Sequence, residues 1–420
     1  MARMNILSLV FVLALCIALC LRLWLSLRQI RHVRKHRDHV PAPFAADIDL
    51  DAHRKAADYT VSKGRLGLFS MGLDFVVVLV WTLGGGLTAL DDAWRGAGFN
   101  GLNTGVLVIG SFALINALIG LPVSLYSTFG IEADFGFNRT TARTYVMDLL
   151  KGVLLAVALG LPLLYAALAL MKKAGDFWWL YLWVLWFGFS LFITWAYPKF
   201  IAPLFNKFSP LTDDALKLRI EGLLMRCGFK SEGVFVMDGS TRSAHGNAYF
   251  TGFGAHKRIV FFDTLMATLR PEEIEAVLAH ELGHFKLKHV LQRLVLSAVL
   301  GLAGLALLGW LYRQDWFYTG MGVAAPSSYM ALLLFMLLLP PFLLMLEPLA
   351  SAWSRRHEFE ADAYANVQAD GAALIRALVK LYRDNASTLT PDPLHSAFYD
   401  SHPPAIRRIA HLQALSDAPR

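Results

Sequence analysis

Long apolar segments recur along this chain and constrain its fold more than any other feature. Seven runs contain few charged side chains: roughly 5–27, 66–90, 105–126, 152–171, 177–198, 290–312 and 328–350. About 20 apolar residues in an α-helix cross the hydrocarbon core of a bilayer, so each run predicts a transmembrane helix. The chain is 56% hydrophobic and 17% charged, with a mean hydropathy of +0.47, which is too apolar for a soluble globular protein. The sequence therefore predicts a polytopic, mainly α-helical membrane protein.

The distribution of Lys and Arg predicts how these helices are oriented. Only Arg3 precedes the first run, whereas basic residues are frequent between positions 28 and 65. The positive-inside rule therefore places the N-terminus outside and the 28–65 loop in the cytoplasm, and alternation places the C-terminus in the cytoplasm. The first run lacks a small-x-small cleavage site, so we expect a signal anchor rather than a cleaved signal peptide. We expect a multi-pass protein of a bacterial cytoplasmic membrane.

The excess of basic residues is explained by the membrane. The formal net charge is +7, and the basic side chains gather at the borders of the apolar runs without interleaved aromatic residues. This pattern is typical of contact with lipid headgroups and argues against a nucleic-acid partner. The lipid bilayer is therefore the first predicted partner.

The polarity of the chain divides it into four parts. We expect a five-span membrane region over 1–198, a cytoplasmic-side catalytic segment over 199–289, two further spans over 290–350, and a helical C-terminal part of the catalytic domain over 351–420.

The two polar parts carry distinct secondary-structure patterns. Helical periodicity covers 211–229, and three short runs of β-forming residues predict a small antiparallel sheet, at 233–238, 247–251 and 258–262. Pro271, followed by two glutamates, predicts the start of a helix. The last part is predicted to be helical, with breaks at 390–393 and 402–404.

The helix that begins at Pro271 carries the motif H-E-L-G-H over residues 280–284. His280 and His284 are four positions apart, so both imidazoles lie on one helical face and can bind one metal ion. Glu281 follows the first histidine, where its carboxylate can accept a proton from a metal-bound water. This arrangement is typical of zinc metallopeptidases, and one zinc ion per chain is predicted.

A catalytic zinc site needs a third protein ligand and an open position for water. His289 lies five positions past His284, which takes it off the ligand face of a continuing helix. The segment after the last span offers Glu358 and Asp362, which are four positions apart on one helical face, while Glu360 points away. Spacing alone leaves open whether one of this pair binds zinc or both belong to a solvated acidic face.

The chain resembles the type I CAAX prenyl endopeptidases, the membrane zinc metallo-endopeptidases that include the a-factor-converting enzyme. The resemblance rests on blocks that occur in order along most of the chain: FGFNRTT (135–141), GSTRSAHGNAYFTGFGAHKRIVFFDTLM (239–266), HELGH (280–284), EFEAD (358–362) and DSHPPAIRRIAHLQAL (400–415). It implies a ring of about seven transmembrane helices that encloses a water-filled chamber, with the zinc site near the cytoplasmic side.

The resemblance also implies roles for individual residues. His280, His284 and Glu358 are expected to bind zinc, with Glu281 as general base and Asp362 supporting one of the two histidines. A strand edge at Asn247, Ala248 and Tyr249 is expected to pair with the substrate backbone. His402 and Arg408 are expected to approach the scissile carbonyl or the substrate backbone. From the residues alone, His402 and Asn247 also suit turns, and Arg408 suits a helix surface.

The predicted function is that of an integral-membrane zinc metalloendopeptidase that acts on C-terminal peptide segments. Its partner is a peptide or protein, with prenylation of the C-terminus as an open question. A non-proteolytic membrane quality-control factor is the alternative, but a structural zinc site has four protein ligands and would not need Glu281. Three ionisable residues within the apolar runs, Asp74, Arg293 and Glu347, must face protein or water, and Asp74 is the best candidate to face a chamber.

Overall fold

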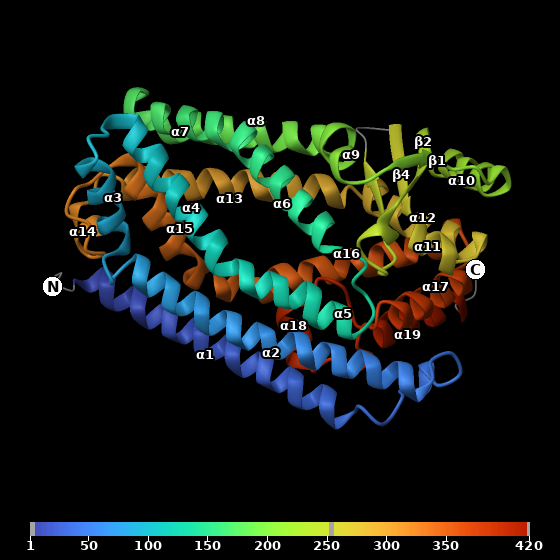
Figure 1. Cartoon of the computed structure of the whole chain (residues 1–420). Helices are drawn as coiled ribbons and strands as arrows, with labels where there is room; N and C mark the ends of the chain where they lie inside the picture. Colours follow the sequence, from blue (N-terminus) through green and yellow to red (C-terminus); the bar gives the residue numbers. More distant parts are fainter. Residues whose placement is uncertain (1–4, 252–255, 418–420) are drawn as a thin grey trace.

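The computed structural model describes residues 5–251 and 256–417 of the chain, and helices dominate it (Figure 1). Seven helical segments in these residues are long and apolar enough to cross a membrane, which is the number that the sequence predicts. They are Ile6–Lys35, Leu50–Trp81, Gly101–Asp134, Ala142–Lys173, Gly175–Phe205, His289–Leu311 and Ser328–Gln368.

The first two spans and the sixth are single helices, namely α1 (Ile6–Lys35), α2 (Leu50–Trp81) and α13 (His289–Leu311). The other four combine shorter helices: α4 (Gly101–Leu125) with α5 (Glu132–Asp134), α6 (Ala142–Leu155) with α7 (Leu161–Lys173), α8 (Trp178–Ala196) with α9 (Ala202–Phe205), and α15 (Ser328–Leu343) with α16 (Glu347–Gln368). Single π-helical turns join the first three pairs. A 3₁₀ turn (Leu344–Leu346) joins the fourth, directly after the Pro340–Pro341 pair near the end of α15.

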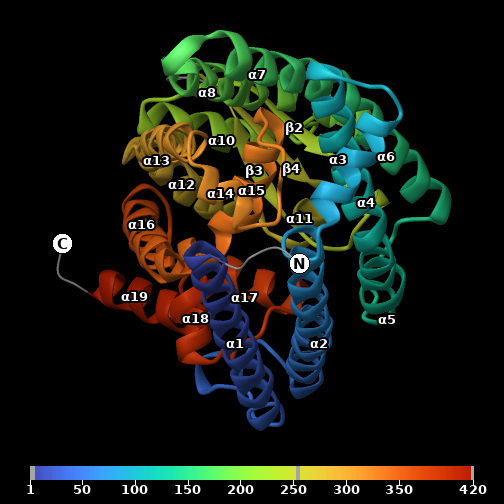
Figure 2. The same cartoon turned by 90° about the vertical axis from the view of Figure 1, so that its left-hand side faces the viewer.

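The spans surround a central region when the molecule is viewed along its long axis (Figure 2). α1 and α2 pack side by side on one flank, with α7, α8 and α13 on the opposite flank (Figure 1). A cavity of about 590 Å³ lies between α2 and α4, and its lining includes Asp74, Asn116 and Ser127. The polar residue that the sequence assigns to a chamber therefore faces a cavity.

The second span ends earlier than its predicted limit at residue 90. α2 stops at Trp81, and the glycines Gly84–Gly86 turn the chain into the short helix α3 (Gly86–Gly96), with Gly85 at a φ of +77°. Glycine adopts this left-handed conformation without steric cost. At the other end the helix extends back to Leu50, because the Asp49 side chain caps it by accepting from the Ala52 amide at 2.7 Å.

The extramembrane part gathers at the end of the molecule opposite α3 and α14 (Asp315–Thr319) (Figure 1). Its helices are α10 (Asp214–Cys227), α11 (Asp263–Thr268), α12 (Pro271–Lys286), α17 (Gly371–Asp384), α18 (Pro393–Tyr399) and α19 (Ala405–Asp417), and its strands are β1 (Phe208–Pro210), β2 (Lys230–Met237), β3 (Ala248–Thr251) and β4 (His256–Phe262). The breaks predicted near 390–393 and 402–404 separate α17, α18 and α19. One buried core joins Leu223, Phe261, Leu278 and Leu374, so the polar segments before and after the last two spans pack together.

The sheet is mixed, whereas the sequence analysis predicted an antiparallel sheet. The strand order is β1-β2-β4-β3, and β2 pairs with β4 in parallel while β1–β2 and β3–β4 are antiparallel. After β2 the chain passes through a 3₁₀ turn (Gly239–Thr241) and then runs back along β3 to the end of the sheet at which β2 began. β4 therefore runs in the same direction as β2. As a result, β3 lies at the edge of the sheet.

Candidate metal centre

Helix α12 presents the H-E-L-G-H motif. Pro271 occupies its first turn, and the buried Glu273 carboxylate accepts from the Arg270 amide at 2.8 Å and from Lys380 Nζ at 2.7 Å. This fastens the start of α12 to α17. A side chain at Gly283 would have its Cβ 3.1 Å from Ala361 Cα, so only glycine lets α16 pack this closely on the motif. The glycine of the motif therefore sets how near the residues of α16 come to the two histidines.

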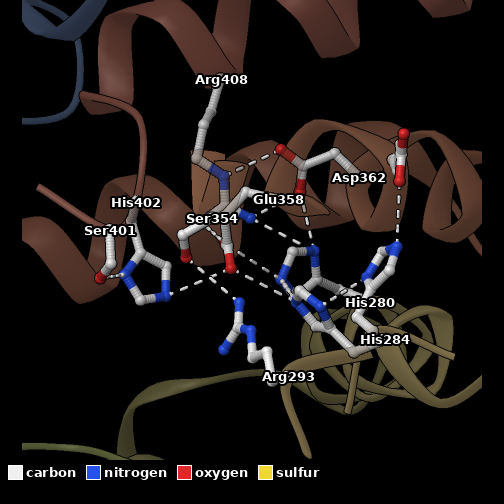
Figure 3. Close-up of polar contacts among 11 residues, drawn as sticks. His280, His284, Arg293, Ser354, Glu358, Asp362, Ser401, His402 and Arg408 are labelled. Carbon is white, nitrogen blue, oxygen red and sulfur yellow. Dashed lines mark hydrogen bonds and ion pairs between the residues drawn. The ribbon is translucent and has the colours of Figure 1, made fainter. Parts of the chain in front are cut away.

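Three side chains from α12 and α16 meet at the centre (Figure 3). His280 Nε2 lies 3.3 Å from His284 Nε2 and 3.4 Å from Glu358 Oε2, and His284 Nε2 lies 3.3 Å from Glu358 Oε1. Bonds of 2.0–2.1 Å from one tetrahedral metal ion place its ligand atoms about 3.3 Å apart. Glu358 Oε2 is buried and has no hydrogen-bond partner, as expected for an oxygen that binds an ion. These residues can hold a metal ion.

Asp362 and Arg408 lie behind this triangle and are buried. Asp362 Oδ1 is 2.9 Å from His280 Nδ1, which fixes the ring so that Nε2 faces the centre. Arg408 donates to both oxygens of Asp362, at 2.8 and 2.5 Å, and its guanidinium reaches to 3.6 Å from Glu358. Burial and the charge of Arg408 act to lower the pKa of His280, but its contacts with the carboxylates of Asp362 and Glu358 outweigh them and raise it to about 9.

His402 borders the open side of the centre. Its Nε2 lies 3.5 Å from Glu358 Oε1, and its Nδ1 is 3.0 Å from the Ser401 hydroxyl. The side chain remains 63% exposed, so a substrate can reach it. The pKa of His402 is lowered, chiefly because surrounding protein displaces water from around the ring, and Arg408 adds to this effect. Its imidazole is therefore neutral at pH 7 and can donate a hydrogen bond.

The remaining predicted site residues lie on α12 and around the start of β3. Glu281 is partly exposed and follows His280 on α12. Its negative charge is one of several influences on the pKa of His402, and it acts to raise that pKa. Ala248 and Tyr249 begin β3, an edge strand that pairs with β4 on one side, and Asn247 directly precedes it. The Asn247 side chain is exposed and accepts from the Ala248 amide at 2.8 Å.

The environment of His289 differs from the one that its spacing predicts. In a continuing helix His289 would turn off the ligand face, but α12 ends at Lys286 and the chain turns through Lys288, at a φ of +61°, before α13 starts at His289. The turn brings His289 back towards the motif, and its Nδ1 lies 3.0 Å from His284 Nδ1. A left-handed lysine is uncommon, and no pattern in the sequence predicts it.

The other two in-membrane charges are paired. Glu347 contacts Arg22 at 3.2 Å, and Arg293 donates to Ser354 Oγ at 3.1 Å. Both therefore face polar groups of the protein, as ionisable residues within apolar runs must.

Fold and site together define a class of protein. The chain is a multi-pass membrane protein in which an H-E-x-x-H helix and a glutamate from the extension of the last span bring three metal-binding side chains together. This combination is that of a membrane metallopeptidase.

Comparisons with known proteins identify the family. Residues 29–207 match the family described as CAAX prenyl protease N-terminal, five membrane helices, and residues 210–416 match peptidase family M48. The chain belongs to the CAAX prenyl protease 1 group of peptidase family M48, whose members are membrane metalloproteases.

Individual relatives cover nearly the whole chain. CAAX prenyl protease 1 of Saccharomyces cerevisiae is 33% identical over 424 residues, which span 94% of this chain and 92% of the relative. The human homologue is 31% identical, over 93% of this chain and 92% of its own length. The crystal structure of S. mikatae Ste24p superposes with a TM-score of 0.90 at 32% identity, covering 98% of this chain and 100% of that chain.

Proposed function

We propose that this chain is a zinc endopeptidase that cleaves near the C-terminus of membrane-associated proteins, with prenylated CAAX segments as its first candidate substrates. The observation that carries the proposal is the triangle of His280 Nε2, His284 Nε2 and a Glu358 oxygen at 3.3–3.4 Å. Two imidazoles and one carboxylate at tetrahedral spacing are a donor set that suits zinc. The substrate class comes from the names of the relatives, which are CAAX prenyl proteases.

The residues around the ion have distinct tasks in this proposal. A zinc ion bound there supplies Lewis acidity, which lowers the pKa of water and polarises the scissile carbonyl. Glu281 accepts the proton of the attacking water at its carboxylate and later delivers it to the leaving amine. His402 donates a hydrogen bond from its exposed imidazole to the carbonyl oxygen as negative charge develops there.

Asp362 and Arg408 keep the ligands in place. Asp362 holds His280 through Nδ1, and Arg408 neutralises the buried carboxylate. Only 7% of the Arg408 side chain is exposed, which favours this positioning role. A direct contact between Arg408 and the substrate backbone stays a prediction.

The substrate backbone is proposed to bind along β3. One side of this strand pairs with β4, and Asn247 takes part in that pairing because its carbonyl accepts from the Phe262 amide at 3.0 Å. Successive residues of a strand turn their amide and carbonyl to opposite sides, so Ala248, between Asn247 and Tyr249, offers its backbone groups on the outer side to an extended peptide. Backbone pairing reads little of the side-chain sequence, so it suits a protease with several substrates.

The test compares a farnesylated CAAX peptide with its unprenylated twin, using the full chain in detergent. Zinc-loaded protein is expected to cut the farnesylated peptide, and a chelator is expected to abolish cleavage until zinc is added back. Equal cleavage of the twin would show that the lipid is not required. Absence of cleavage of both peptides by zinc-loaded protein would overturn the proposal and favour a non-proteolytic quality-control role.

We also propose that the N-terminus lies outside and the C-terminus in the cytoplasm of a bacterial membrane. The support is the contrast between Arg3 alone before the first span and the many basic residues over 28–65. A green fluorescent protein fused after Arg420 should fluoresce, and alkaline phosphatase fused there should be inactive. The opposite pair of results would reverse the orientation.

A further inference from the structure

The two histidines of the motif are supported in different ways. His280 Nδ1 lies against a carboxylate, Asp362 Oδ1, at 2.9 Å. His284 Nδ1 instead lies 3.0 Å from a second imidazole, His289 Nδ1, and His289 Nε2 lies 3.0 Å from Glu360 Oε2. Glu360 is in turn held by Arg356 Nε at 2.8 Å. His284 is therefore the first member of a chain of contacts that runs away from the centre.

The positions of the protons in this chain follow from the metal-binding atom. His284 points Nε2 at His280 and Glu358, so a metal there uses that nitrogen and leaves the ring proton on Nδ1. His284 Nδ1–H must then donate to His289 Nδ1, which accepts as a bare nitrogen. The remaining proton of His289 is consequently on Nε2, where it donates to Glu360 Oε2. Each contact in the series thus joins one donor to one acceptor.

We propose that His289 is a positioning residue that fixes the tautomer and the orientation of the metal ligand His284, with Glu360 fixing the tautomer of His289. This inference rests on the proposed function, since it requires an ion at His280, His284 and Glu358. His289 is suited to the task because it is 1% exposed, so water does not compete for its Nδ1. Partners of this kind typically change metal affinity by about ten- to a hundredfold when they are removed.

His357 provides a matched control. It is as buried as His289, at 2% exposed, and its ring stacks on that of His289 with centroids 3.9 Å apart and planes 3° from parallel. Within residues 5–251 and 256–417 no hydrogen bond joins His357 to His284, and His357 Nδ1 has no hydrogen-bond partner. His357→Phe keeps a flat ring in the stack, so it should leave the affinity for the ion unchanged.

A conservative substitution separates hydrogen bonding from packing. Glutamine offers one carbonyl acceptor and an amide donor, so His289→Gln can still accept from His284 and donate to Glu360. His289→Phe fills the same space and can do neither. A packing role predicts that phenylalanine is tolerated better than glutamine, whereas the positioning role predicts the reverse order.

The experiment measures zinc affinity and stoichiometry rather than activity. Full-length protein in detergent is stripped of metal, and competition with a chelator gives the zinc Kd of wild type, His289→Phe, His289→Gln and His357→Phe. We expect the zinc Kd of His289→Phe to rise about ten- to a hundredfold, that of His289→Gln to stay closer to wild type, and that of His357→Phe to match it. A Co²⁺-loaded sample should also show changed visible bands in His289→Phe, because the ligand field depends on how His284 is held.

The possible failures are distinguishable. An unchanged Kd in His289→Phe would overturn the positioning role while leaving the zinc site intact. Failure of wild type to bind zinc, or binding that survives loss of His280, would overturn the proposed function itself. His289, His357 and Glu360 have ligand atoms within 4.8 Å of one another. If wild type binds two zinc ions and His289→Phe binds one, these residues form a second metal site, and the positioning role is wrong.

Discussion

Arg408 is a buried cation at the centre. It compensates Asp362, which lies fully buried and has both oxygens on the guanidinium. Removing one partner of a buried ion pair typically costs about 3–5 kcal/mol, because the other charge is left in a medium of low polarity. We therefore expect Arg408→Met to lower the midpoint of thermal unfolding markedly. The neighbouring Arg407 is exposed, so Arg407→Met should have little effect, and an equal loss in both variants would contradict this account.

The pH dependence of metal uptake follows from His280. Its pKa of about 9 in the metal-free site means that the ring carries two protons at neutral pH, and one must leave before Nε2 can bind an ion. Affinity for zinc should therefore rise by up to about tenfold per pH unit below pH 9 and then level off. Chelator competition at pH 6.5, 7.5 and 8.5 measures this slope. A pH-independent Kd would show that His280 is already neutral or is not a ligand.

Single residues could be predicted from the sequence where chemistry and spacing agree. The spacing of His280 and His284 places them on one helical face, and both imidazoles meet in the structure. Spacing did not distinguish Glu358 from Asp362, because both lie on one face of α16. The packing of α16 on α12 decides between them: it places Glu358 next to the Nε2 atoms of His280 and His284, and it places Asp362 next to Nδ1 of His280. The contact of His289 with His284 depends on one left-handed residue, Lys288, and was not predictable.

At the scale of elements, the packing of α12 on α16 determines the metal-binding geometry. A Cβ at Gly283 would approach Ala361 Cα to 3.1 Å and Tyr364 Cβ to 3.2 Å, so Gly283→Val must push α16 away from the histidines. Overpacking of this kind costs about 1–3 kcal/mol, and here the strain acts on the distance to Glu358. We expect Gly283→Val to bind zinc at least about tenfold more weakly, since 1.4 kcal/mol is a factor of ten in binding. Gly152→Val, where a side chain would meet nothing within 4 Å, is the control.

The elements themselves were predictable to different degrees. The seven spans were predicted because a run of apolar residues long enough to cross a bilayer is a strong local signal. Three of the four described strands were located near their observed positions and β1 was not predicted, and the antiparallel prediction is wrong for β2 and β4 but correct for β3 and β4. Alternating or apolar runs predict a strand without specifying its neighbour, and β2 and β4 become parallel only through the crossover between them. The early end of α2 depends on Gly84–Gly86, three small residues that hydropathy alone does not separate from a span.

At the scale of the whole molecule, the accessibility of position 74 to water tests whether the interior of the membrane region is hydrated. Asp74 lines two cavities, whereas Val76, two residues along α2, is 53% exposed on another face of the same helix. A cysteine thiol reacts as its thiolate, which forms in water and not in lipid. In a background without Cys16, Cys20 and Cys227, Asp74→Cys should therefore react with a charged thiol reagent roughly ten times faster than Val76→Cys or more. Equal rates would argue against a hydrated interior.

The helices α12 and α16, which carry the metal-binding side chains, reach into the end of the molecule where the extramembrane helices gather (Figure 1). Glu358 lies on the same continuous helical segment as the last span, Ser328–Gln368. One of the metal-binding side chains is therefore carried on the helical extension of the last span.

The most direct test of the whole account measures bound zinc and peptide cleavage in the same samples of wild type and Glu281→Gln. Glu281 is placed to move protons and not to bind the ion, so both proteins should contain one zinc per chain. Wild type should cleave the farnesylated peptide, and Glu281→Gln should do so at least about a hundredfold more slowly. Full activity in a zinc-loaded Glu281→Gln protein, or activity in wild type stripped of zinc, would contradict the account.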